Sequence, residues 1–430
     1  MESFVLRRVR IDDVQFGEKS GVEGTRLTVS ERELRELLLE DRFLKDVKVE
    51  IARPGESKRI VPIKDILEPR AKLDPEQEVF PGVISDLNYA PGTGTTVVLD
   101  GVCVMTSGRL VNFQEGLVDM TGPGAGFCLF SGKNNVVLVM EPAENISKHD
   151  HERAVRLAGV KAARYLGALG RNIPDYTETV YPVAGPVELA ALYPHLPKIV
   201  YVCQTIAQGL LHDNYYYGVN AQGCLPMLVH PTEFMDGAIV SGNCAAPCHK
   251  HTTYHLQNNP IVEDLLDEHG KTLNFLGVIV TPVRTAFGEK ERICRQAFKL
   301  ARMLGAEGAI ISEDGGGNPE ADLMFATRLF EKNGIKVVLV TDEYAGSDGA
   351  SPGLADITPE ADAVVTNGNG NQRVTLPPMK ETIGVLDTVE RITGGHSGGL
   401  RPDGAVEMEI AGIMGSTNEL GIENLRTIAI

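Results

Sequence analysis

The sequence predicts a multidomain protein of the α/β and α+β classes, with a β-rich N-terminal half and a C-terminal open parallel sheet layered with helices. Three observations predict this fold. The chain has 430 residues, which is longer than an ordinary domain with a single hydrophobic core. Its first third consists of short strand-like pieces and glycine-rich turns. Its second half alternates short apolar runs with helical segments, which is the pattern of a layered α/β domain.

The N-terminal half is predicted to contain two units. Residues 1–80 form a small β-rich module, in which FVLRRVRIDDVQF and VKVEIA are strand-like and a Pro-Gly pair breaks the pattern. Residues 81–243 form a mixed α/β region that ends at a predicted cleavage site. In this region a helix is expected over 149–167, and strands over 198–205 and 237–242. The chain therefore leaves a strand just before residue 243.

Residues 244–430 are predicted to form the parallel-sheet domain. Short, nearly continuous apolar runs suit strands that are buried on both faces of such a sheet. The helical segments between them carry apolar stripes and end at Gly305 and Gly334. The second of these helices is expected to have Asn318 as its N-cap and Pro319 at its first position. The expected strands are 276–281, 308–312, 335–341 and 363–367.

Polar loops follow three of these strands, with the sequences EDGGGNPEADL, DEYAGSDG and GNGNQR. Because ligands of open parallel sheets bind outside the carboxyl ends of the strands, these loops are predicted to form a rim that binds the substrate or a partner subunit. The glycine run lacks the spacing of a dinucleotide site and the ending of a P-loop, so ordinary turns remain the alternative. The rim candidates are Asp314, Gly315, Gly316, Gly317, Asn318, Asp342 and Asn369.

Composition excludes several classes of partner. The formal charge is -17 and no Lys/Arg run is present, which argues against nucleic-acid binding. The apolar run VVLVM at 136–140 is far too short to span a membrane, and the first residues lack the apolar core of a secretory signal. Seven scattered cysteines suit a reducing compartment. We therefore expect a cytoplasmic protein without nucleic-acid or membrane partners.

The stretch VSGNCAAPCHKH at 240–251 concentrates thiols and imidazoles. Zinc binds Cys and His, but structural zinc sites usually combine cysteine pairs at closer spacing with a second pair a dozen or more residues away, so no metal is predicted here. A second interpretation is a thiol nucleophile whose proton is taken by a nearby histidine. Buried cysteines with ordinary hydrogen bonds are the third, although they do not explain the local density. The candidate catalytic residues are Asn243, Cys244, Cys248, His249 and His251.

Self-cleavage is a further interpretation of the same stretch. The Cys244 thiol can attack the carbonyl carbon of Asn243 and shift the acyl group from nitrogen to sulfur. β-Elimination then converts the cysteine into dehydroalanine, and hydrolysis of its imine tautomer leaves a pyruvoyl group at a new N-terminus. Ser241 and Gly242 are small enough to allow the strained backbone that this reaction needs.

Four segments together resemble one family. VSGNCAAPCHKHTTYHLQNNP, SEDGGGNPEADL, TNGNGNQ and GGHSGGLRPDG are similar to segments of the α/β-subunit proproteins of component B of the clostridial glycine, sarcosine and betaine reductases. The resemblance covers the whole chain and implies cleavage between Asn243 and Cys244, with Cys244 becoming the pyruvoyl group. The fragments would have 243 residues and 430 minus 243, that is 187, residues. The D-proline reductase proprotein is a longer relative.

The resemblance also implies an activity and partners. The chain would be the pyruvoyl-bearing subunit of a complex that deaminates glycine, sarcosine or betaine reductively to acetyl phosphate in amino-acid fermentation, with glycine as the first choice. The pyruvoyl carbonyl would activate the substrate's amino group. The implied partners are a selenocysteine-containing component B subunit, a small selenoprotein carrier (component A) and component C, which releases acetyl phosphate. The alternatives are a D-proline reductase-like subunit, a zinc-dependent hydrolase that uses the Cys/His cluster and a non-catalytic scaffold subunit.

Overall fold

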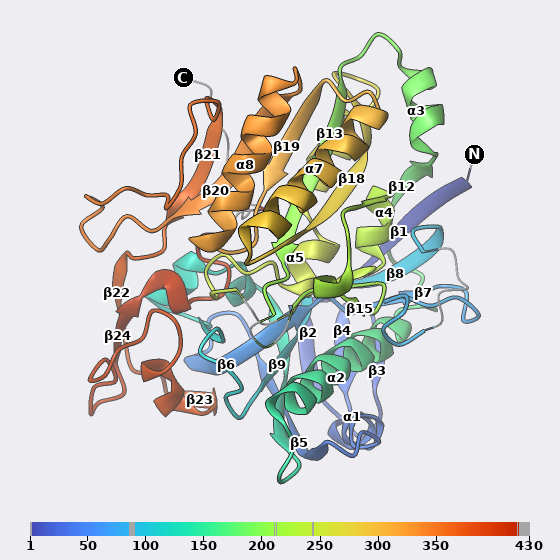
Figure 1. Cartoon of the computed structure of the whole chain (residues 1–430). Helices are drawn as coiled ribbons and strands as arrows, with labels where there is room; N and C mark the ends of the chain where they lie inside the picture. Colours follow the sequence, from blue (N-terminus) through green and yellow to red (C-terminus); the bar gives the residue numbers. More distant parts are fainter. Residues whose placement is uncertain are drawn as a thin grey trace.

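A mainly parallel sheet organises the C-terminal half of the protein (Figure 1). The computed structural model of the chain describes residues 2–85, 91–209, 211, 213–242, 245–418 and 420. Neighbouring strands of this sheet are parallel, except that β16 runs antiparallel to β18. In spatial order the strands are β16 (Met227–Val229), β18 (Asn274–Val283), β13 (Lys198–Ile206), β19 (Gly308–Ser312), β20 (Lys336–Glu343) and β21 (Val364–Asn369).

The four apolar runs expected to form strands all lie in this sheet, as β18, β19, β20 and β21, which confirms the predicted parallel α/β arrangement. Every residue of β18 is buried, as expected for a strand covered on both faces. The expectation of burial on both faces is wrong for β20, which is partly exposed, and for β21, which has no buried residue because it lies at the edge of the sheet. The expected strand at 198–205 is also present, as β13. Its place was not predicted: it lies between β18 and β19, although it precedes residue 243 in the chain.

Helices α7 and α8 pack against each other and against this sheet (Figure 1). The buried side of α7 includes Ile293 and Ala297, which belong to the predicted apolar stripe. The N-cap of α8 is Gly317, so the prediction that Asn318 is the N-cap is wrong by one residue. The reason is that the Glu320 carboxylate accepts a hydrogen bond from the Gly317 N–H at 2.8 Å. The helices of this half are α3 (Pro186–Leu192), α4 (Pro231–Met235), α5 (Thr253–Gln257), α6 (Pro260–Glu268), α7 (Phe287–Met303) and α8 (Asn318–Lys332).

The N-terminal half contains two mixed sheets, which confirms its β-rich character. Helix α2 (Lys148–Ala168) crosses both sheets and matches the helix expected over 149–167. It starts at Ser147, whose hydroxyl accepts from the Asp150 N–H. One sheet has the order β12 (Thr177–Val183), β1 (Glu2–Arg10), β8 (Gly94–Asp100) and β7 (Arg70–Lys72). The other has β10 (Gly116–Asp119), β6 (Lys58–Leu67), β9 (Val102–Gly108), β11 (Asn134–Pro142) and β5 (Leu44–Ala52).

Shorter elements complete the description of the fold. Helix α1 (Glu31–Leu38) packs on β5 and α2. Small sheets are formed by β2 (Asp13–Phe16), β4 (Arg26–Val29) and β3 (Gly21–Glu23); by β15 (Val219–Asn220), β14 (Tyr215–Tyr216) and β17 (Ile239–Val240); and by β22 (Arg373–Leu376) and β24 (Val406–Glu409). Single 3-10 turns lie at Pro123–Phe127, Leu129–Gly132, Ala221–Gly223, Leu386–Glu390 and Ile410–Gly412.

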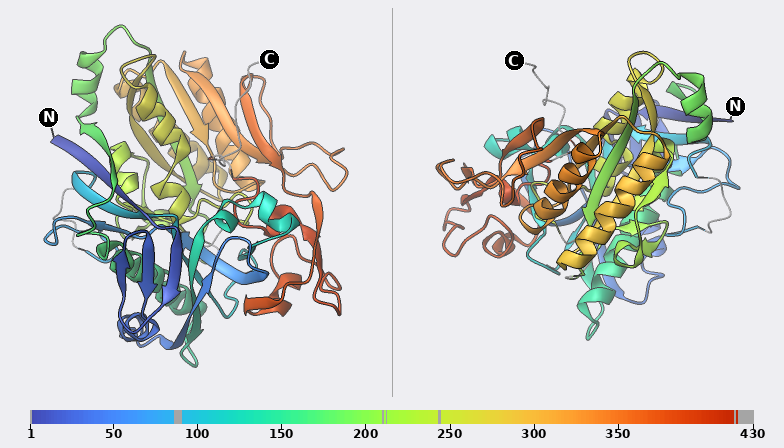
Figure 2. Two further views of the ribbon diagram at one scale, coloured as in Figure 1. Left: turned by 180° about the vertical axis from the view of Figure 1, so that it is seen from behind. Right: turned by 45° about the horizontal axis from the view of Figure 1, so that its top comes forward.

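The two halves of the chain share sheets. Strand β23 (Glu381–Gly384) pairs in parallel with β6, so a late segment adds to an early sheet. Figure 2 shows this C-terminal part, in red, beside the N-terminal sheets when the molecule is seen from behind. Within the N-terminal half, β1 of the predicted 1–80 module pairs with β8 and β12 of the predicted 81–243 region. The sheets thus extend across both of the predicted unit boundaries, near residues 80 and 243. The division into these units stays a prediction.

Two further observations concern the cysteines and the helices. The cysteines in the described part of the chain are free thiols, and Cys103, Cys128, Cys203, Cys248 and Cys294 are buried. None of the helices within the described ranges combines the length and the apolar character needed to cross a bilayer.

Candidate functional site

The segment after β17 places three of the predicted catalytic residues, Cys248, His249 and His251, near the carboxyl end of the parallel sheet. Asn243 and Cys244, the predicted scissile pair, lie outside the described residues. The site is therefore built from Ser241 and Gly242 on one side of this pair and from the chain after Ala245 on the other. The second segment packs close to the loops that follow β13, β19 and β20.

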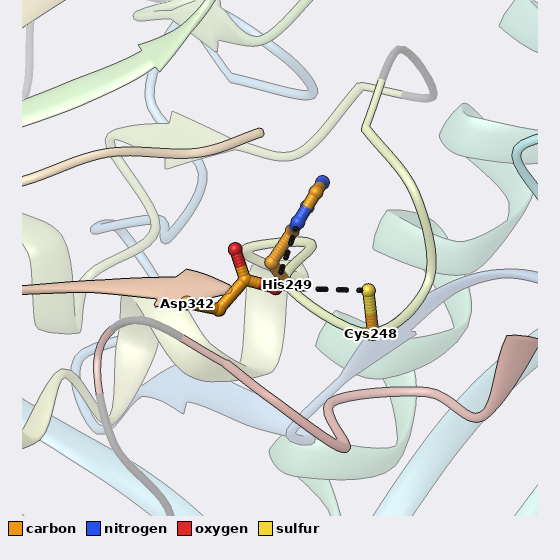
Figure 3. Close-up of side chains that lie close together, drawn as sticks. All are labelled: Cys248, His249 and Asp342. Carbon is orange, nitrogen blue, oxygen red and sulfur yellow. Dashed lines mark hydrogen bonds and ion pairs between the residues drawn. The ribbon is translucent and has the colours of Figure 1, made fainter. Parts of the chain in front are cut away.

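Cys248, His249 and Asp342 converge at this end of the sheet (Figure 3). The Nδ1 atom of His249 is 3.2 Å from Oδ2 of Asp342, and Sγ of Cys248 is 3.9 Å from the same oxygen. The Thr417 hydroxyl donates to this oxygen at 2.7 Å. The Tyr344 hydroxyl lies 3.0 Å from the Cys248 sulfur. The cluster therefore joins two residues of the Cys/His stretch to Asp342 of the predicted rim.

This cluster supports two kinds of chemistry. The sulfur, nitrogen and oxygen atoms lie within 4.8 Å of one another, so they form a donor set that could hold a cation such as Zn²⁺. Alternatively, the carboxylate fixes the orientation of the imidazole, as in acid–base sites where an Nδ1–H group donates to Asp and Nε2 exchanges a proton. In Figure 3 the second ring nitrogen of His249 points away from Asp342.

A pocket of about 480 Å³ opens beside the cluster. Two of its glycines make this space possible. A Cβ atom on Gly316 would lie 3.1 Å from the Tyr344 ring and 3.5 Å from the His249 ring, and one on Gly315 would lie 2.8 Å from Ile206. The walls are Gln114, Ile206, Gln208, Ala245, Ala246, His249, Gly315, Gly316, Gly317, Pro319, Glu320, Tyr344, Pro352, Gly353, Leu354 and Ala355. The glycine run of the predicted rim is therefore part of the pocket wall.

Other predicted residues have neighbouring but different positions. Asp314 is buried behind the pocket, where it accepts a hydrogen bond from the His251 N–H at 3.2 Å. His251 is fully buried, and burial lowers the pKa of its imidazole, partly opposed by the Asp314 charge. Asn318 accepts a hydrogen bond from Gln208, and Asn369 accepts one from the Ala345 N–H. These two amides fasten rim loops.

Several pocket residues were missed from the sequence. Tyr344 is two residues after Asp342 in a loop already singled out, so the position of that loop could have indicated it. Gln208 follows β13, whose place in the sheet was not predicted. Gln114 comes from the N-terminal half, and no local pattern connects it with the parallel sheet. Contacts of this kind depend on the tertiary fold.

His255 gives a prediction about stability in acid. Burial, and secondly the charge of His251, lowers the pKa of His255 to about 3, while its Nδ1 atom is bonded to the Thr252 hydroxyl at 2.8 Å. The unfolded state binds this proton near pH 6.5, so the stabilisation by neutral His255 is complete above that pH and is lost as the pH falls toward 3. We expect the free energy of unfolding to fall by up to about 1.4 kcal/mol per pH unit from this group.

Urea unfolding of wild type and His255→Gln between pH 7 and pH 5 measures this slope. The variant should show a shallower dependence of unfolding free energy on pH, whatever its absolute stability. The matched control is Thr327→Val, a buried position without a titrating group, which should keep the wild-type slope. Equal slopes in wild type and His255→Gln would contradict the prediction.

Comparison with known proteins identifies the relatives of the chain. The family described as glycine/sarcosine/betaine reductase component B subunits matches residues 2–428. The chain is 47% identical over 417 residues to the glycine reductase complex component B subunits alpha and beta of Acetoanaerobium sticklandii, covering 96% of this chain and 97% of that protein. It is 46% identical over 420 residues to the sarcosine reductase complex component B subunit alpha of Peptoclostridium acidaminophilum, covering 98% of each.

A more distant relative is the D-proline reductase proprotein PrdA of Acetoanaerobium sticklandii, which is 24% identical over 361 residues. That alignment covers 77% of this chain and 53% of the longer proprotein. No solved structure matches the chain. The match along nearly the whole chain confirms the resemblance seen in the four sequence segments: this chain belongs to the glycine/sarcosine/betaine reductase component B subunits.

Proposed function

We propose that this chain is the pyruvoyl-bearing subunit of component B of a glycine, sarcosine or betaine reductase. The observation that carries the proposal is the position of the pocket: Ala245 and Ala246, which directly follow the predicted pyruvoyl residue Cys244, line it together with His249. The relatives are component B subunits of reductase complexes, which supports membership of an oxidoreductase assembly. Glycine is the substrate that we propose first.

The walls of the pocket fit a small covalent carbonyl group and a small amine. Alanine and glycine residues leave space next to the new N-terminus, and a larger side chain at Gly316 would meet Tyr344. A pyruvoyl group supplies an electrophilic ketone that draws electrons from an amine bound to it. This chain's own residues would hold the substrate and move protons: His249 at its second ring nitrogen, with Asp342 fixing the ring through Nδ1.

The proposed activity needs other subunits. The sequence contains no selenocysteine, so the nucleophile that attacks the substrate's α-carbon would come from a selenocysteine-containing component B subunit. A small selenoprotein carrier (component A) would accept the two-carbon group, and component C would release acetyl phosphate. We further propose that the complex acts in the cytoplasm and that the pyruvoyl group, without a metal, is the cofactor of this subunit.

Intact-mass measurement tests the proposal. Protein from the assembled complex should contain fragments of 243 and 187 residues, the smaller one blocked at its N-terminus and reactive with a hydrazide probe because it carries a ketone. Cys244→Ala should leave one chain of 430 residues and an inactive complex, because no thiol is present to attack the preceding carbonyl group. Cys128→Ala, a buried cysteine elsewhere, is the matched control and should still be cleaved.

Three results would contradict the proposal in different ways. A single uncut chain with an unmodified Cys244 in an active complex would exclude a pyruvoyl group. One equivalent of zinc that disappears in Cys248→Ala would favour a metal site formed by Cys248, His249 and Asp342. Full activity of a Cys244→Ala complex would identify the chain as a scaffold subunit.

A further inference from the structure

We propose that Thr253 and Asn214 fix Ser241 and Gly242, the two residues before Asn243 of the predicted scissile bond. Two buried carboxylates, Asp65 and Asp314, hold Thr253 and Asn214 in place. These four side chains are then positioning residues for self-cleavage. The inference rests on the proposed function, because it concerns the bond between Asn243 and Cys244. Its evidence lies in the described residues on both sides of that bond.

The first half of this arrangement holds Ser241. The Ser241 N–H donates to the Thr253 hydroxyl oxygen at 3.0 Å. That hydroxyl donates its own proton to Oδ2 of Asp65 at 2.6 Å, and the Thr253 N–H donates to Oδ1 of Asp65 at 2.9 Å. The Thr253 hydroxyl has one proton, which it donates in the hydrogen bond to Asp65. A lone pair of the Thr253 oxygen is therefore left to accept the hydrogen bond from the Ser241 N–H. All three residues are buried, so water does not compete for these bonds.

The second half holds Gly242. The Gly242 N–H donates to Oδ1 of Asn214 at 2.9 Å. The Asn214 side-chain NH₂ donates to Oδ2 of Asp314 at 2.9 Å and to the Ile206 carbonyl oxygen at 3.3 Å. Since both amide protons have acceptors on one side, the amide oxygen has to face Gly242. Asp314 is itself held by the N–H groups of Ile206 and His251.

Steric limits at Gly242 strengthen the same conclusion. A Cβ atom on Gly242 would lie 2.1 Å from the Asp213 carbonyl oxygen and 2.9 Å from the Asn214 nitrogen. Backbone atoms cannot move aside as a flexible side chain can, so a substitution there would displace the segment. Only glycine can therefore occupy position 242 without displacing this segment.

The physical consequence concerns the rate of cleavage. An N to S acyl shift needs the thiol close to one face of the preceding carbonyl carbon, and the rate of such an intramolecular reaction depends strongly on orientation. Two consecutive N–H groups with fixed acceptors limit the rotation of the chain that enters the bond. Asp65 belongs to β6 and Asp314 follows β19, so the arrangement exists only when both halves of the chain have folded together.

A time course of cleavage tests the inference. Full-length chain is made by pulsed translation, and precursor and fragments are separated by gel and identified by intact mass. Thr253→Val, which keeps the shape but removes the hydroxyl, should cleave roughly 10- to 100-fold more slowly than wild type. Thr253→Ser should restore most of the rate. Asn214→Leu, which removes the amide at similar volume, should also be slow.

The matched control is Thr327→Val, because Thr327 is also buried and its hydroxyl donates to the Leu323 carbonyl oxygen within α8, away from the predicted scissile bond. It should cleave at the wild-type rate, and circular dichroism should show wild-type folding in each variant that is compared. Wild-type rates in both Thr253→Val and Asn214→Leu would overturn the inference, as would equal slowing by Thr327→Val. A wild-type chain that never separates into fragments would overturn the proposed function itself, which distinguishes the two failures.

Discussion

Replacing His249 with alanine should lower the turnover of the assembled reductase by about 10²- to 10⁴-fold, the range typical for removal of a general acid or base. The imidazole is buried, lies at the pocket wall and has its Nδ1 atom 3.2 Å from the Asp342 carboxylate. Alanine would remove the ring that we propose transfers a proton. The measurement is acetyl phosphate formed per cleaved subunit, so that any defect in maturation is counted separately.

Two companion variants locate the effect of His249. Asp342→Asn keeps a polar group beside the ring but loses the charge that fixes its tautomer, and turnover should fall by less than in His249→Ala. His396→Ala, at an exposed histidine in the C-terminal tail, is the matched control and should leave turnover unchanged. Turnover of His249→Ala within a few-fold of wild type, in fully cleaved protein, would remove His249 from the proposed proton transfers.

Replacing Asp236 with asparagine should lower the free energy of unfolding by about 3–5 kcal/mol, because it leaves the charge of Lys72 buried without its partner. The Lys72 and Asp236 side chains form an ion pair with exposures of 2% and 0%. Asp236 also accepts hydrogen bonds from the Gly92 N–H and the Thr96 hydroxyl, each at 2.6 Å. Urea titration of both proteins at neutral pH measures the difference.

An exposed ion pair supplies the control for Asp236. Arg10 and Asp12 lie 2.7 Å apart, but their side chains are 79% and 48% exposed, so Asp12→Asn should change stability far less than Asp236→Asn. The double variant Lys72→Met with Asp236→Asn should recover part of the loss, since no buried charge remains and the asparagine oxygen can still accept a hydrogen bond from Gly92 or Thr96. A loss in Asp236→Asn no larger than that in Asp12→Asn would contradict the importance of burial.

The sequence predicted those parts of the fold that depend on local patterns. β18, β19, β20 and β21 carry short, nearly continuous apolar runs, and α2 carries a helical repeat with a serine N-cap, so each was located within a few residues. The place of β13 could not be predicted, because strand order in a parallel sheet is decided by packing between segments far apart in the chain. The start of α8 was misplaced because Glu320 caps Gly317.

In the candidate site, too, the features set by local sequence patterns were predicted and those set by tertiary contacts were not. The loops after β19 and β20 were expected to meet because parallel strands end at one edge. In the structure the glycine run and His249 line one pocket, and Asp342 contacts His249 beside it. The partners of the residues before the predicted cut were invisible in the sequence. Asp65 and Thr253 are separated by 188 residues, and nothing near either of them in the sequence marks the other.

The position of β13 between β18 and β19 has a consequence for a chain that is cut after residue 243. The N-terminal fragment would then contain β13, and the C-terminal fragment would contain its neighbours β18 and β19. Cleavage would turn a monomer into an obligate heterodimer whose shared sheet formed before there were two chains. An uncut precursor would refold as one molecule, whereas separated fragments would have to meet again by diffusion. The cut protein would therefore refold less readily than the precursor after dilution from denaturant, because cleavage has removed the covalent connection between the two parts of the sheet.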